Sequence, residues 1–203
     1  MRRNTETSKG FTLIEVLVAI TIVMVGLLGL AGMQARAQVA EFESYQRAQA
    51  LVLLYDMMDR IQNNRNTASC FVNSASTYYG DTSAPPSLSC SVSSPADNAL
   101  AIASMTAWHN LLQGASETKG TTKVGAMVGA RGCITYATNT EYINASTGLN
   151  ITGTGEYTLL VSWQGMAETF VPTKTCGTTT QYGADTKRRT VWATMRIATL
   201  KAQ

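Results

Sequence analysis

The sequence has few charged residues and almost no histidine. Only 14% of its 203 residues are Asp, Glu, Lys or Arg, and His109 is the one histidine. It has no P-loop, no G-x-S-x-G, no H-E-x-x-H and no dinucleotide-binding fingerprint. The carboxylates of Asp81, Asp97 and Asp185 are scattered and form neither an EF-hand loop nor a spaced acid pair. We therefore expect no catalytic residue, no cofactor and no metal site, and the chain is predicted not to be an enzyme.

The four cysteines are Cys70, Cys90, Cys133 and Cys176. No C-x-x-C pair occurs and the histidine is distant in sequence, so we expect neither a redox thiol nor a metal ligand. An even number of cysteines in an exported chain predicts two disulfides. Three pairings exist, and Cys70–Cys90 with Cys133–Cys176 is favoured because each bond closes a loop between neighbouring elements.

A long apolar stretch begins near the N-terminus. Residues 16–35 carry no charge over 20 positions, which is about the length of helix needed to cross a bilayer. One carboxylate, Glu15, comes just before this stretch. Ionisable groups in such segments are costly and usually have a functional partner.

The ten residues before the apolar stretch are basic. They contain Arg2, Arg3 and Lys9 against Glu6, a net charge of +2. Positive residues keep a flanking segment in the cytoplasm, so residues 1–10 should stay inside and the C-terminal part should lie outside. An ordinary signal peptide cut after Ala31 or Ala35 is the alternative, but its apolar core would be shorter.

The rest of the chain predicts an α+β fold. One helix is expected from residue 11 to about 62, with an apolar stripe formed by Leu51, Leu54, Tyr55 and Met58. After a loop-rich stretch over 66–96, a short helix should run from an N-cap at Asp97 to Gln113. Its buried face would carry Ala101, Met105, Trp108 and Leu112.

Short strands then dominate the pattern. The candidates are Lys123–Val128, Cys133–Ala137, Tyr157–Trp163, Thr169–Val171 and Thr190–Ala198. Two sets alternate onto one face each: Tyr157, Leu159, Val161 and Trp163, and Val191, Ala193, Met195 and Ile197. A period of two predicts half-buried antiparallel strands. We expect the long N-terminal helix to pack on a mainly antiparallel sheet, with one short extra helix.

The stretch from Lys9 to Val16, KGFTLIEV, resembles the N-terminus of type IV prepilins and pseudopilins. The resemblance implies that a prepilin peptidase cuts between Gly10 and Phe11 and that Phe11 is then N-methylated. Gly at the cut gives the peptidase an unhindered backbone. The resemblance also implies that Glu15 pairs with the new α-amine of an incoming subunit during filament assembly and sets its axial register.

The predicted parts of the chain follow from this cut. They are a leader (1–10), a transmembrane and filament-core helix (11–35), its amphipathic continuation (36–64) and an extracytoplasmic globular domain (65–203). Residues 51–64 and the glycine-rich 26–32 look like the minor pilins of the PilV group, the type IV pilus modification proteins. The resemblance implies a structural subunit that helps initiate pilus assembly in a tip complex and supports twitching, adhesion or DNA uptake.

The implied partners are the prepilin peptidase, other minor pilins, the major pilin, the pilus assembly platform and the inner membrane. The chain would cross that membrane once with its C-terminal domain in the periplasm, and would be part of the extracellular pilus after assembly. Two alternatives stay open: a type II secretion pseudopilin, and a pilus-anchored adhesin or DNA-binding tip protein. Direct nucleic-acid binding is not expected, because the basic residues Lys174, Lys187, Arg188 and Arg189 show no aromatic interleaving.

Overall fold

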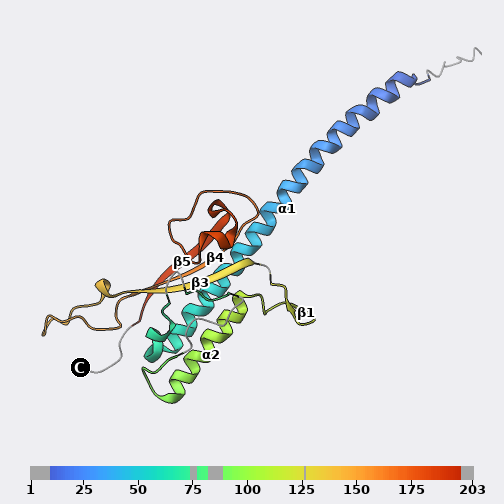
Figure 1. The fold of residues 1–203 in the computed structure, drawn as a ribbon. Helices are drawn as coiled ribbons and strands as arrows, with labels where there is room; N and C mark the ends of the chain where they lie inside the picture. The colour runs from blue at the N-terminus through green and yellow to red at the C-terminus, as the bar shows by residue number, and fades with distance from the viewer. Residues whose placement is uncertain (1–9, 74–76, 82–88, 126, 198–203) are drawn as a thin grey trace, which may run out of the picture. The chain divides into compact units, whose positions relative to one another are not determined.

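A computed structural model describes residues 10–73, 77–81, 89–125 and 127–197 (Figure 1). Of the leader expected at residues 1–10, only Gly10 is among the described residues. The chain divides into two units, Met1–Phe42 and Glu43–Gln203. One helix, α1 (Leu13–Asn63), has its first part in one unit and its second part in the other.

The first unit consists of the apolar part of α1. The helix begins at Leu13, two residues later than predicted, because the Thr12 carbonyl accepts the N–H groups of Glu15 (3.1 Å) and Val16 (3.3 Å) and so occupies the N-cap position. Every residue from Leu13 to Phe42 is exposed on this single chain.

The second part of α1 lies in the globular unit and supplies one wall of its core. Its buried residues are Gln46, Ala50, Leu54, Met57 and Ile61. In the predicted stripe, Leu54 is buried and Leu51 and Met58 pack against the core while partly exposed. Only Tyr55 was wrong, since it is 56% exposed. Apolar residues are so frequent in this part of α1 that more than one set of them follows the helical period. Packing against the rest of the globular unit then determines which residues are buried. The helix ends at Asn63, and both the side chain and the backbone N–H of Asn64 donate to the Arg60 carbonyl (2.8 and 3.1 Å).

The next two helices along the chain are a 3₁₀ helix and a second α-helix. A 3₁₀ helix, η1 (Arg65–Phe71), occupies the start of the expected loop. The short helix α2 (Pro95–Leu112) was predicted, but its N-cap is Ser94 and not Asp97. Ser94 Oγ accepts the Asp97 N–H (3.2 Å), and the Asp97 carboxylate accepts the Ser93 hydroxyl (2.7 Å). Hydrogen bonds from Ser93 and Ser94 hold the pKa of Asp97 below its usual value.

The main sheet contains three antiparallel strands in the order β3-β4-β5 (Figure 1). They are β3 (Val128–Ala137), β4 (Glu156–Gln164) and β5 (Arg188–Arg196). A separate hairpin pairs β1 (Thr118–Lys119) with β2 (Thr122–Lys123). The α+β fold class is confirmed, and both predicted alternating faces point into the core.

Two predicted strands are wrong. Between Lys123 of β2 and Val128 of β3, Val124 and Gly125 have no regular secondary structure and Met127 forms a bend, while Ala126 lies outside the described residues. The backbone is crowded here, because a Cβ on Gly125 would lie 2.3 Å from the Gly114 Cα. The stretch Thr169–Val171 belongs to a loop in which Phe170 is 97% exposed.

The bounds of the other strands shift by a few residues. β3 starts five residues before Cys133 because an irregularity between Val128 and Arg131 lets the pairing with β4 continue. β5 starts at Arg188 and ends at Arg196, while Ala198, the predicted last residue, lies outside the described part.

The core joins α1, α2 and the sheet. Ala101, Met105, Trp108 and Leu112 of α2 are all buried, as predicted. Trp108 packs closely on β3, where a Cβ on Gly132 would lie 2.1 Å from the indole ring. The indole Nε1–H donates to the Leu53 carbonyl of α1 (2.9 Å).

Two disulfides tie the connecting segments to this core. Cys70–Cys90 joins η1 to the segment before α2, with a Cα–Cα distance of 5.4 Å. Cys133–Cys176 joins β3 to the loop between β4 and β5, with a Cα–Cα distance of 5.6 Å. These are the two pairs that the loop argument favoured.

Candidate functional site

The start of α1 is open to other molecules. Phe11 is 83% exposed, and a Cβ placed on Gly10 would have no atom within 4 Å. Both residues precede the first helical residue, Leu13, so the Gly10–Phe11 peptide bond is not protected by helical hydrogen bonds. This geometry leaves the bond accessible to a peptidase, and the cut at this bond stays a prediction.

Glu15 lies in the first turn of the helix. A carboxylate in this position is stabilised by the positive end of the helix dipole. Thr12 and Glu15 also have the spacing of a capping box. The local structure thus explains why a carboxylate is tolerated here, but the negative charge on an apolar surface still favours an external cation.

Thr21 shows how a neutral polar side chain is accommodated in the same stretch. Its hydroxyl hydrogen bonds to the Leu17 (3.2 Å) and Val18 (2.8 Å) carbonyls of the same helix. A hydroxyl can be satisfied in this way within apolar surroundings. A carboxylate cannot, because helix carbonyls offer it no hydrogen-bond donor.

The first part of α1 carries many large apolar side chains that no other described residue covers. The described part contains one helix long and apolar enough to cross a membrane, and the qualifying stretch is not buried by the rest of the chain. A helix that is apolar all round requires apolar surroundings, either lipid or other helices. This helix can therefore anchor the chain in a membrane or pack with similar helices in an assembly.

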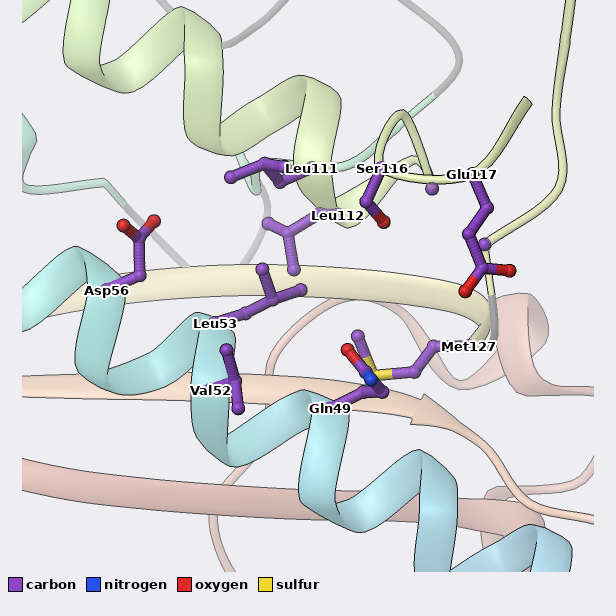
Figure 2. Close-up of a pocket in the computed structure, with 11 residues that line it drawn as sticks. Gln49, Val52, Leu53, Asp56, Leu111, Leu112, Ser116, Glu117 and Met127 are labelled. Atoms are coloured by element: carbon purple, nitrogen blue, oxygen red, sulfur yellow. The ribbon is translucent and has the colours of Figure 1, made fainter.

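The globular unit has a shallow pocket of about 250 Å³ (Figure 2). Leu53 of α1 and Leu112 of α2 point toward each other there, and Glu117 lies at one end. The second lining carboxylate, Asp56, is paired with Arg60 at 2.8 Å. The described residues contain no group of three His, Cys, Asp or Glu that could hold a metal ion.

His109 has a structural role in the described residues. It is 3% exposed, and its Nδ1 accepts the Gly80 N–H at 3.1 Å. This hydrogen bond joins the backbone at Gly80 to α2.

The basic residues near the last strand have different structural roles. Arg188 is 1% exposed and pairs with Asp185 at 3.1 Å. Arg189 pairs with Glu43 at 3.1 Å. Lys174 lies 5.6 Å from the centre of the Trp192 ring. The sequence pattern that placed these cations together therefore does not describe a single binding group.

Sequence reasoning missed Glu43. Its Oε1 accepts the Met166 N–H (3.1 Å), the Ala167 N–H (3.2 Å) and the Arg189 guanidinium (3.1 Å). These partners lie more than 120 residues away along the chain. No local pattern could have identified it.

Comparison with known families gives two matches. The family model for the prokaryotic N-terminal methylation motif matches residues 7–31. The family model described as type IV pilin Tt1218 matches residues 32–101. A search of curated proteins gave no match, and a search of solved structures gave none either. The two matched ranges adjoin and run from residue 7 through α1 and η1 into α2.

Proposed function

We propose, from the premise that the chain is type IV pilin-like over residues 7–101, that it is a minor pilin of the PilV type: a structural subunit that helps initiate pilus assembly. One observation carries the proposal. The apolar part of α1 is exposed throughout, carries Glu15 in its first turn and directly follows the accessible Gly10–Phe11 bond.

Processing would come first. A prepilin peptidase cuts after Gly10 and methylates the amine of Phe11. Before assembly, the helix over residues 11–35 holds the chain in the inner membrane as a single span, with residues 65–203 in the periplasm. The positive leader supports this orientation. The two disulfides support an oxidising compartment for the globular part.

Assembly would then move the helix from lipid into a bundle of pilin helices. The methylated α-amine of one subunit and Glu15 of a neighbour would each be costly alone in these apolar surroundings. Paired, they offset most of that cost, and only one axial position of the incoming subunit brings them together. Glu15 would therefore act as a register device.

The minor role rests on the resemblance of residues 51–64 to the PilV group. A subunit of this kind joins other minor pilins in a priming complex on the assembly platform, and the major pilin extends the filament below it. The sheet and loops of the globular unit then face outward.

The test is chemical analysis of the native protein together with one variant. Intact mass and N-terminal sequencing should find a chain that begins with methylated Phe11. A chain that begins after Ala31 or Ala35 would overturn the proposal. Glu15→Ala should leave cutting intact and lower the amount of the protein in sheared pili by about a hundredfold or more, because a buried charge left without its partner costs about 3–5 kcal/mol and each 1.4 kcal/mol is tenfold.

Glu41→Ala is the matched control, because it removes an exposed carboxylate from the same helix. It should leave the amount in pili unchanged. Normal incorporation of Glu15→Ala would refute the register mechanism. Recovery of the protein only in secretion filaments would assign it to the pseudopilins instead.

A further inference from the structure

The loop between β4 and β5 presents an apolar surface to solvent. Met166 is 55% exposed, Phe170 is 97% exposed and Val171 is 46% exposed. We call residues 166–171 the apolar loop. Exposed apolar patches on a folded unit mark sites of contact with proteins or membranes.

The apolar loop is held in place by hydrogen bonds. Glu43 accepts the N–H groups of Met166 and Ala167 (3.1 and 3.2 Å). The Arg189 guanidinium donates to Thr169 Oγ1 (2.6 Å) and to the Ala167 carbonyl (2.8 Å). These bonds keep the loop in a conformation in which Phe170 points away from the core.

Chain connectivity limits how far the apolar loop can lie from the membrane. Glu43, which holds the loop, is eight residues after Ala35, the end of the uncharged stretch. Eight residues of α-helix span about 12 Å. The headgroup region extends several ångströms beyond the hydrocarbon, and a spanning helix is commonly tilted by about 20°. The loop is therefore tethered within reach of the membrane surface whenever the apolar helix is inserted.

The chemistry of the loop also suits that surface. Aromatic and aliphatic side chains partition into the boundary between headgroups and acyl chains. Outside the ion pairs of Arg188 and Arg189, the charged residues in or nearest to the loop in sequence are Glu168, Lys174 and Lys187, a net charge of +1. Apolar contact should therefore dominate over attraction to anionic lipid.

We propose that the apolar loop inserts into the headgroup region of the inner membrane while the subunit waits for assembly. This inference rests on the proposed function, because it requires the helix over residues 11–35 to be in the membrane. The loop would hold the globular unit on the bilayer and would leave it when the subunit enters the filament. The alternative is that the apolar loop contacts another pilin subunit instead of the membrane.

The experiment uses the full processed chain in vesicles of phosphatidylethanolamine and phosphatidylglycerol. All four native cysteines are in disulfides, so one introduced cysteine can be labelled alone with an environment-sensitive fluorophore. Thr173→Cys reports on the apolar loop and keeps Phe170 in place. Leu149→Cys, at a residue 69% exposed in another loop, is the control. Val23→Cys reports on insertion of the helix.

Quenching by lipids that carry a nitroxide near the headgroup gives the readout. Quenching at position 173 should be at least about twofold stronger than at position 149, as expected for a segment in the interface. Adding Phe170→Ser should bring it to the level of position 149, while Met33→Ser in the spanning helix should not. Deep quenching at position 23, by lipids labelled within the acyl chains, would show that the helix is inserted. Equal quenching at positions 173 and 149 in the same sample would then overturn the loop inference and leave the membrane anchor intact.

Two further results would also decide against it. Absence of deep quenching at position 23 would refute the membrane anchor itself, and with it this inference. Protection of position 173 only after other pilin subunits are added would assign the loop to a subunit interface.

Discussion

Loss of the Cys133–Cys176 disulfide should destabilise the globular unit more than loss of Cys70–Cys90. The first bond joins residues 43 apart and the second joins residues 20 apart. In the chain-entropy model these loops correspond to about 4 and about 3.3 kcal/mol of unfolding free energy. Burial adds to the difference, because Cys133 and Cys176 are 1% and 0% exposed while the other two are only partly buried. Removing their sulfur atoms should cost about 1 kcal/mol more.

The perturbation is a double substitution to alanine at each disulfide. For Cys133→Ala with Cys176→Ala we expect a loss of about 5 kcal/mol, and for Cys70→Ala with Cys90→Ala a loss of about 3 kcal/mol. Since domains have about 5–15 kcal/mol in total, the first variant should be close to unfolding.

Guanidinium unfolding of the full chain in detergent, followed by tryptophan fluorescence, measures both losses. The dependence on denaturant should be compared as well, since a change in slope would report a change in the unfolded state. An equal or larger loss from the Cys70–Cys90 variant would refute the ranking. A loss below about 2 kcal/mol from the Cys133–Cys176 variant would show that the loop-entropy argument does not apply here.

Three further predictions concern the core of the globular unit. Trp108→Phe removes the hydrogen bond to the Leu53 carbonyl and leaves a cavity, so it should lower the free energy of unfolding by about 2–3 kcal/mol. Trp192 is half-exposed, so Trp192→Phe should change the free energy of unfolding by less than about 0.5 kcal/mol. Gly132→Ala should cost about 1–3 kcal/mol, measurable as a lower midpoint of thermal unfolding, because its Cβ would overlap the Trp108 ring; an unchanged midpoint would contradict the packing described. Burial raises the pKa of Tyr157 to about 12. Unfolded tyrosines ionise near pH 10, so the stability that Tyr157 contributes is present below that pH and is lost as the pH rises from about 10 to 12. Absorbance at 295 nm in the wild type and Tyr157→Phe would measure this, and early ionisation in the folded chain would refute it.

Local patterns explain which elements could be predicted. The helix from Leu13, the face of α2 and the alternation along β4 each depend on periodicity within one element, and all three are present. The predicted strand Thr169–Val171 failed because its short apolar run has the pattern of a strand but finds no neighbour to pair with among the described residues. The N-cap at Asp97 failed because Ser94 offers the same chemistry three residues earlier.

The candidate site divides in the same way. Gly10, Phe11 and Glu15 are adjacent in sequence and form a motif that requires no knowledge of the fold. The bonds of Glu43 to Met166, Ala167 and Arg189 cross more than 120 residues, so only folding brings them together.

The sequence by itself determined the parts of this protein that depend on neighbours along the chain: an apolar helix of membrane-spanning length, a carboxylate in its first turn, and an α+β domain after it. These follow from composition and period, which are local properties. Tertiary structure alone decided which apolar residues on α1 are buried and that the adjacent Arg188 and Arg189 pair with different carboxylates. It also decided that the 166–171 loop is held by hydrogen bonds with Phe170 exposed. Each of these depends on side chains far apart in sequence competing for the same core, and that competition is resolved only when the chain folds.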